Sequence, residues 1–600
     1  MKKHLITIVL ILFCLGGIAI SQTVPRPEYP RPQFERNSWM NLNGTWSYIF
    51  DFGNSGHDRK YQESKGFDGK IIVPFCPESK LSGVGYKDFI NDMWYHRMID
   101  IPGGWSGKKI ILHFGAVDYK SEVYIDGKFV GRHFGGTSSF EYDITPFVTA
   151  GQSHNLVLYV NDDLRSGKQT GGKQCFNYFS GGCSYTRTTG IWQTVWMEAL
   201  SPNGLKSCQV IPDLDQKQVV VYPSFYKENN SYTLKVTLKD NGKIVSEKSV
   251  RATNSSVCVL PVPHVKTWSP ENPFLYDLSY VVTDKNNKIV DEVNSYVGMR
   301  KVHIEGNRIF LNNKPYYLRL VLDQGFYPEG IWTAPTDGDL KKDIEMSMEA
   351  GFNGARLHQK VFEERFHYWA DKLGYLTWGE SSSWGSDCND VEAARNFIGE
   401  WSEIIARDRN YPSIIAWTPF NESWNNDNFQ YPRFVQDIYR ITKGLDPTRP
   451  VNDASGGTHV MTDIWTVHNY EQNPTKLTEI LTPGADGRMF SNDNYRCAPY
   501  SGQPYLLDEF GGIRWIPTEK DKNSEKSWGY GNAPRTVEEY YTRLGGLVDA
   551  ILSRPNVWGY CFTQLTDVEQ EQNGIYLYNR SPKFDMSRIK AIFSKNPAFQ

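Results

Sequence analysis

Two glutamates in the second half of the chain stand where buried strands are predicted to end. Glu422 follows the apolar run 414–420, and Glu509 follows the apolar run 505–507. Two carboxyl groups that face each other across one cavity suit acetal hydrolysis, because one assists the leaving oxygen as an acid while the other attacks the anomeric carbon as an anion. A structural ion pair with a neighbouring arginine explains a glutamate at a strand end equally well, and the residue pattern leaves both interpretations open.

The elements that must position these glutamates are strands alternating with helices from residue 303 to 600. This alternation predicts a (β/α)8 TIM barrel, in which reactive side chains come from the carboxyl ends of the strands. The predicted strands are 316–321, 353–357, 375–378, 413–418, 451–453, 464–467, 505–507 and 558–562. The predicted helices lie near 339–349, 362–372, 391–407, 434–442 and 536–552.

Further polar or aromatic residues on these predicted strands, or just after them, are candidates for substrate contacts. They are Asp323, Arg356, His358, His468, Tyr470, Gln564 and Trp558. Structural alternatives remain open: a loop cap for Asp323, a rim ion pair for Arg356 and core packing for Trp558. Glu380, after the third strand, is interpreted as a supporting residue rather than a rival catalyst.

Two regions precede the barrel, and both show the short alternating runs and turn signals of antiparallel sheets. Residues 22–200 predict a β-sandwich, and residues 201–302 predict a smaller immunoglobulin-like sandwich of about seven strands. Aromatic residues make up 14% of the 600 residues. They fit either β-rich cores or apolar faces for sugar rings, and composition does not separate these uses.

The charge balance and the first residues limit the compartment and the partners. With 65 basic and 68 acidic residues, the chain has no overall field to attract nucleic acid. Lys2 and Lys3 precede an apolar run ending near Ser21, which predicts a signal peptide over 1–21 and export to the periplasm or medium. No membrane insertion is expected after its cleavage. The bulky residues before Cys14 argue against a lipoprotein.

The eight cysteines after residue 21 show no zinc-binding spacing, and most are predicted to be buried thiols. Cys175 and Cys183 bracket a glycine-rich loop, and a disulfide between them stays open.

Ordered motifs along the chain resemble glycoside hydrolase family 2, which includes β-galactosidases, β-glucuronidases and β-mannosidases. The resemblance covers about 31–599 and rests on the segments at 31–34, 41–46, 73–79, 94–95, 189–192, 418–423 and 508–512. It implies a jelly-roll sugar-binding-like domain, an immunoglobulin-like domain and a catalytic barrel. It also implies that Glu422 is the general acid/base, that Glu509 is the nucleophile and that Asn421 contacts the sugar 2-hydroxyl.

The same resemblance places Arg356 beside the nucleophile and lets Tyr470 donate a hydrogen bond to it. His358 and His468 are then expected to contact the sugar. For acid catalysis, the pKa of Glu422 is expected to be raised by burial or by the charge of Glu509. The chemistry requires neither a cofactor nor a metal.

Two departures from the family pattern affect the sugar. β-Glucuronidases of this family use an Asn-x-Lys-Gly element, whereas the aligned stretch here is 571–574, which lacks the lysine and adds Glu571. A uronic acid is therefore disfavoured unless a cation arrives from elsewhere. Thr563 or Gln564 stands where many members have tryptophan. The loop 162–187 is a candidate to reach over the barrel mouth from the first domain.

The sequence thus predicts an exported, retaining, exo-acting β-glycosidase with a carbohydrate substrate, and a β-galactoside is the first choice. A β-glucuronide, β-mannoside or arabinoside is the alternative within the same chemistry. A non-catalytic glycan-binding protein is the alternative from another class. Whether the chain forms a homo-oligomer stays open.

Overall fold

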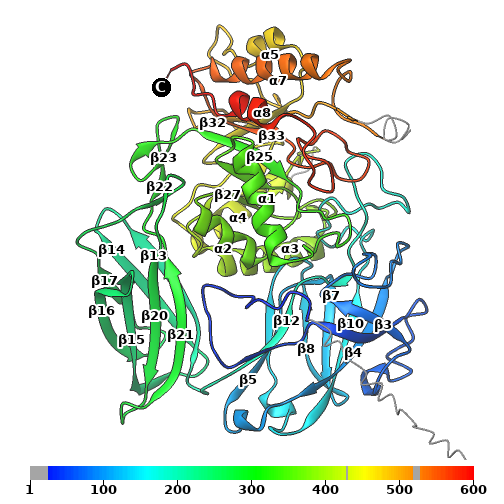
Figure 1. Ribbon diagram of the computed structural model, residues 1–600, viewed down its shortest axis with the longest axis vertical. Coiled ribbons are helices and arrows are strands. Elements are labelled where there is room, and N and C mark those ends of the chain that lie inside the picture. The colour runs from blue at the N-terminus through cyan, green and yellow to red at the C-terminus, as the bar shows by residue number, and fades with distance from the viewer. Residues whose placement is uncertain (1–23, 427–429, 518–526, 600) are drawn as a thin grey trace, which may run out of the picture.

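The computed structural model describes residues 24–426, 430–517 and 527–599, which form three lobes (Figure 1). Two β-sandwiches lie side by side below a barrel whose strands and helices come from the second half of the chain. This arrangement confirms the predicted fold class. The predicted signal peptide, residues 1–21, lies outside the described residues.

The first sandwich packs a four-stranded sheet, ordered β1-β12-β5-β9, against a six-stranded sheet, ordered β3-β2-β4-β10-β7-β8. Alternate apolar side chains such as Trp46, Tyr95 and Val123 fill the core between the sheets. The strands are β1 Trp39–Asn41, β2 Gly44–Phe50, β3 Gly69–Val73, β4 Asp92–Asp100, β5 Lys109–Phe114, β6 Val117–Asp118, β7 Lys120–Ile125, β8 Lys128–Phe134, β9 Phe140–Asp143, β10 Ser153–Asn161, β11 Gly190–Ile191 and β12 Val195–Leu200.

The second sandwich has sheets ordered β13-β14-β17 and β16-β15-β20-β21, as expected for a seven-stranded immunoglobulin-like domain. Its strands are β13 Leu205–Asp213, β14 Gln218–Phe225, β15 Asn229–Asp240, β16 Lys243–Ala252, β17 Cys258–Pro261, β20 Tyr276–Thr283 and β21 Ile289–Val297. Short pairs connect it to the barrel: β18 Trp268–Ser269 with β19 Asn272–Pro273, and β22 Val302–Glu305 with β23 Arg308–Leu311 and β24 Lys314–Pro315.

The barrel contains a parallel sheet ordered β28-β27-β26-β25-β33-β32-β31. These strands are β25 Leu318–Asp323, β26 Gly354–Leu357, β27 Leu376–Glu380, β28 Ile414–Thr418, β31 Trp465–Asn469, β32 Tyr505–Gly511 and β33 Val557–Thr563. The fifth position, predicted at 451–453, is occupied by a bridge from Val451 to Trp417 and by β30 Ala454–Ser455, which pairs with β29 Phe420–Asn421. The carboxyl ends of the strands therefore share one mouth.

Helices cover the barrel, and several of them begin at residues whose side chains cap the first turn. Thr336 and Asp339 form a capping box at the start of α1, and Thr536 caps α7. The helices are α1 Asp337–Glu349, α2 Glu364–Leu373, α3 Val391–Asp408, α4 Gln430–Leu445, α5 Pro474–Ile480, α7 Val537–Leu552 and α8 Met586–Phe593. The sequence did not predict α5 and α8, which are too short for a strong periodic signal. None of the helices in the described residues combines the length and apolar character needed to cross a bilayer.

A buried arginine ties the two sandwiches together. Arg36, which precedes β1, donates 2.9 Å hydrogen bonds to both oxygens of Asp291 and a 3.0 Å bond to Glu198. All three side chains are buried. Burial acts to raise the pKa of Glu198, but the charge of Arg36 and the hydrogen bond with His113 together outweigh it and lower the pKa to about 2. The relative placement of the lobes thus depends on an ion pair shielded from water.

Replacing this arginine tests the clamp. We expect Arg36→Met to destabilise the protein by about 3–5 kcal/mol, because two buried carboxylates lose their compensating charge. Denaturant unfolding followed by tryptophan fluorescence measures the effect. Lys80→Met is the control, since Lys80 pairs with Glu329 on the exposed surface and its loss should leave the unfolding transition in place. Equal stability of the two variants would contradict the clamp.

Candidate active site

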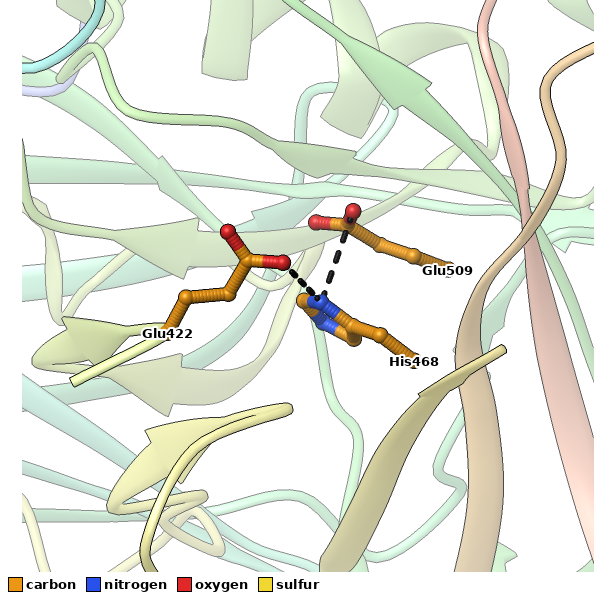
Figure 2. Close-up of side chains that lie close together, drawn as sticks. All are labelled: Glu422, His468 and Glu509. Atoms are coloured by element: carbon orange, nitrogen blue, oxygen red, sulfur yellow. Dashed lines mark hydrogen bonds and ion pairs between the residues drawn. The ribbon is translucent and has the colours of Figure 1, made fainter. Parts of the chain in front are cut away.

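The two glutamates predicted from the sequence meet at the barrel mouth, with one histidine between them (Figure 2). His468 Nδ1 lies 2.8 Å from Glu422 Oε1 and 3.5 Å from Glu509 Oε2. Oxygen atoms of the two glutamates and a ring nitrogen of His468 all lie within 4.8 Å of one another. Two glutamates 87 residues apart in sequence therefore converge on one small space, in which a single glycosidic bond can lie between them.

Glu509 is held by groups from the neighbouring strands. Arg356 Nη2 on β26 donates a 3.0 Å bond to Glu509 Oε1, and the hydroxyl of Tyr470, just after β31, donates to Oε2. Burial by itself raises the pKa of Glu509, but the charges of His468 and Arg356 outweigh it and hold the pKa below its ordinary value. Glu509 is thus an ionised, fixed carboxylate, which a nucleophile requires.

Glu422 corrects one sequence prediction. Its pKa was expected to be raised, whereas it is lowered. Burial acts in the expected direction, but the hydrogen bond and positive charge of His468 oppose it more strongly, and the charge of Lys173 adds to this. The sequence prediction considered the charge of Glu509 and omitted a cation on the other side of the carboxylate.

The backbone at Glu422 is also unusual, because its φ of 42° lies in the left-handed region that non-glycine residues seldom adopt. Its amide donates a 2.8 Å bond to the carbonyl of Ser455, which ends β30. This bond fixes the turn that follows β29. The Glu422 side chain is 32% exposed against 6% for Glu509, so water reaches the first carboxylate more easily.

Three other predicted or interpreted residues lie behind the pair. Arg356 also donates to Asn421 Oδ1 and to Glu380 Oε2, both at 2.5 Å. Asn421 Nδ2 has no hydrogen-bond partner in the described residues, which leaves a donor for a ligand. His358 lies 2.9 Å from Glu380 through Nδ1 and 3.9 Å from Glu509 through Nε2. Burial, with the charges of Lys173 and Arg356, lowers the pKa of His358 well below its ordinary value, so this imidazole is neutral.

The loop 162–187 of the first sandwich reaches the barrel mouth. The amides of Gly171 and Gly172 donate to carbonyls of Trp384 and Ser382 at 2.7 and 3.1 Å. Gly171 lies in the loop's first half. In its second half, the carbonyl of Gly182 accepts a 2.7 Å bond from Gln570 Nε2. Both halves of the loop are therefore held to the barrel by hydrogen bonds.

This loop brings a buried cation into the site. Lys173 is 6% exposed and its ammonium lies 4.9 Å from the Trp384 ring centroid. In the described part of the chain it makes no ion pair within 4.0 Å, although the charges of Glu571 and Glu509 help raise its pKa against burial. Glu571 is buried and accepts hydrogen bonds from the Tyr185 hydroxyl and from Asn573. The charges of Lys173 and Glu571 act on each other, and we refer to these two residues together as one wall of the site.

The structure places three of the predicted contact residues against other protein groups. Trp558 is the second residue of β33, at the amino end of the barrel, and packs on Phe599, so it belongs to the core. Asp323 accepts a 2.9 Å bond from the Gly325 amide and caps the loop after β25. His468 has both ring nitrogens occupied by protein groups, because Nε2 lies 3.0 Å from Ser455 Oγ.

Gln564 donates to Asn573 at 2.8 Å and supports Glu571 through it. Cys175 and Cys183 are free thiols, as are the other cysteines within the described residues.

Sequence reasoning missed four residues that shape the site. Asp508 lies 3.4 Å from His468 Nε2, and Ser455 donates a 2.6 Å bond to Asp508. Tyr530 stacks on Tyr470 with ring centroids 3.4 Å apart. Asp508 and Ser455 follow predicted strands, which was a usable signal. Lys173 lies in the loop 162–187, which the sequence had singled out as a whole, and Tyr530 lies in a loop that no local signal marks.

Three domain models of one family match this chain. Glycosyl hydrolases family 2, sugar binding domain, matches residues 86–179; Glycosyl hydrolases family 2 matches 205–300; and Glycosyl hydrolases family 2, TIM barrel domain, matches 302–486.

Two curated relatives show similar coverage of this chain. A β-galactosidase of Thermoanaerobacter pseudethanolicus is 27% identical over 450 residues, which is 71% of this chain and 56% of the relative. A β-glucuronidase of Paenibacillus borealis is 24% identical over 447 residues, which is 68% of this chain and 72% of the relative. The match therefore spans little more than half of the first relative.

The fold also matches solved structures. The β-glucuronidase from Ruminococcus gnavus in complex with D-glucuronic acid superposes with a TM-score of 0.78 at 21% identity, covering 95% of this chain and 100% of that chain. The three matched domain models follow one another in the order of the three lobes. The chain belongs to glycosyl hydrolases family 2.

Proposed function

We propose that the protein is a retaining β-glycosidase that removes a terminal sugar from an oligosaccharide or polysaccharide. One observation carries this proposal: oxygen atoms of Glu422 and Glu509 lie within 4.8 Å of each other. Retaining glycosidases hold their carboxyl groups about 5–5.5 Å apart, whereas inverting enzymes need about 6.5–9.5 Å to admit a water molecule. The short gap supports direct attack by Glu509.

In the first step, Glu509 attacks the anomeric carbon while Glu422 gives a proton to the glycosidic oxygen. The C–O bond to the leaving group breaks, and a glycosyl ester with Glu509 forms. Arg356 and Tyr470 hold the attacking carboxylate in place before the step. The free amide nitrogen of Asn421 is suited to the sugar 2-hydroxyl, where a hydrogen bond strengthens in the transition state.

In the second step, Glu422 takes a proton from water as the water oxygen attacks the anomeric carbon. The ester bond breaks, Glu509 becomes ionised again, and the sugar leaves with its original configuration. The partial exposure of Glu422 supports access of water to this side of the ester.

The wall formed by Lys173 and Glu571 favours a neutral sugar, with a β-galactoside as first choice. A lysine and a glutamate of opposite charge suit hydroxyl groups, which donate and accept hydrogen bonds. A uronate carboxylate would meet the charge of Glu571. The candidate that competes is a β-glucuronide, because Lys173 is a buried cation without a direct ion pair in the described residues. The loop 162–187 closes one side of the mouth, which supports attack at a chain end.

The nucleophile is tested by chemical rescue. We expect Glu509→Gly to lower kcat on an activated aryl glycoside by about 10⁴-fold, because no ester forms without the carboxylate. Added azide should restore turnover and give a glycosyl azide of inverted configuration, identified by NMR. An unaltered rate in the variant would refute the assignment of Glu509.

The acid/base is tested by varying the leaving group. We expect Glu422→Ala to lower kcat/KM by about 10²–10⁴-fold for alkyl or sugar leaving groups, which need protonation. For 2,4-dinitrophenyl glycosides, which leave as stable anions, the first step should slow by less than about tenfold. Equal losses on both substrates would assign Glu422 a role other than acid catalysis.

The sugar is tested with a panel of 4-nitrophenyl glycosides and two wall variants. We expect the β-galactoside to have the highest kcat/KM, and Lys173→Met to affect it modestly. If a β-glucuronide is the substrate instead, Lys173→Met should lower its kcat/KM by about 10²-fold, because a charged hydrogen bond to the carboxylate is lost. Glu571→Gln is the matched variant and should act in the opposite direction on the glucuronide. Turnover of no glycoside would favour a glycan-binding protein.

A further inference from the structure

His468 occupies a position that acid catalysis by Glu422 alone does not explain. Its ring lies between three carboxylates: Glu422 and Glu509 on the Nδ1 side, and Asp508 on the Nε2 side. The side chain is buried, at 6% exposure, so water contributes little to satisfying it. An imidazole so placed is stable as a cation that donates from both nitrogens.

The two nearest other basic side chains, Arg356 and His358, have partners of their own. Arg356 binds Glu380, Asn421 and Glu509, and His358 lies against Glu380. The groups in direct reach of His468 are Glu422 after β29, Ser455 on β30, and Asp508 and Glu509 on β32. The more distant groups are Arg356 and His358 near β26, Glu380 on β27 and Lys173 in the loop 162–187. Three carboxylates in direct reach outweigh the more distant cations.

We propose that His468 is a positioning residue that stores the proton which Glu422 delivers to the leaving group. In the resting site Glu422 and Glu509 are both ionised, and the proton stays on His468 Nδ1 at the 2.8 Å hydrogen bond. This inference rests on the proposed glycosidase function. It accounts for the ionised Glu422, which would otherwise be in the wrong state for an acid.

The proton balance closes over both steps. As Glu509 attacks, the proton passes from His468 Nδ1 to Glu422 and from Glu422 to the glycosidic oxygen. Glu509 loses its charge in the ester while His468 becomes neutral, so the net charge of the cluster is unchanged. When water attacks, Glu422 takes its proton and returns it to His468, and Glu509 leaves as an anion. The cluster therefore never carries an uncompensated extra charge, which is costly in a buried site.

Removing the stored proton should slow hydrolysis, and the size of this effect should depend on both the pH and the leaving group. In the wild type, the negative charges around His468 overcome burial and raise its pKa to about 9, so His468 keeps the proton that it shares with Glu422 below that pH. His468→Asn retains an N–H donor near the position of Nδ1 but holds no titrating proton. Glu422 must then hold the proton itself, and the basic limb of kcat/KM should move down by about one pH unit or more.

The experiment compares pH profiles of wild type, His468→Asn and His459→Asn on two substrates. For an alkyl glycoside, we expect His468→Asn to lose about 10²-fold at pH 8–9 and much less at pH 5–6. For the 2,4-dinitrophenyl glycoside, it should lose less than about threefold throughout. His459 is the matched control, since it is another buried histidine, paired at 2.7 Å with Asp453, and touches neither glutamate.

A purely structural role for His468 predicts equal losses on both substrates at every pH, and that result would overturn the proposal. An unmoved basic limb would also overturn it. A second readout needs no turnover: the Cε1–H signal of His468, assigned by its absence in His468→Asn, should titrate near pH 9. Titration at an ordinary histidine pKa would overturn the proton store even if the protein hydrolyses glycosides. Inactivity of the wild type on every glycoside, with a signal near pH 9, would refute the glycosidase proposal alone.

Discussion

One imidazolium shared by two buried carboxylates and the partly exposed Glu422 is the interaction on which the site depends. Without a cation between them, Glu422, Glu509 and Asp508 would be three negative charges in a poorly solvated space, and some would have to take up protons. His468 removes that cost and fixes the orientation of two carboxylates at once. The state of Glu422 follows from this cation more than from its own burial.

The barrel makes such a cluster possible because each member comes from a different strand. His468 lies on β31, Asp508 and Glu509 on β32, and Glu422 follows β29. Parallel strands that end at one mouth bring these side chains together without requiring them to be close in sequence. Arg356, on β26, then links Glu509 to Asn421, so the nucleophile and the expected 2-hydroxyl contact share one support.

The first sandwich contributes to the site as well as to the fold. Its loop 162–187 is fixed to the barrel and carries Lys173, whose charge faces the catalytic cluster. Under the proposed function, specificity depends on the packing of domains, because Lys173 and its acidic partner Glu571 come from different lobes.

The sequence by itself determined the order of the domains and the ends of the strands, because periodicity and turn signals are local properties of a segment. It singled out Glu422 and Glu509 as strand-end candidates, and the family resemblance supplied their expected roles. It also determined the bounds of most barrel elements, since apolar runs and capping residues mark them. Tertiary structure alone decided that His468 pairs with Glu422, that Lys173 enters the site and that Trp558 belongs to the core. These depend on distances between segments remote in sequence, and a charge state depends on every charge within a few ångströms.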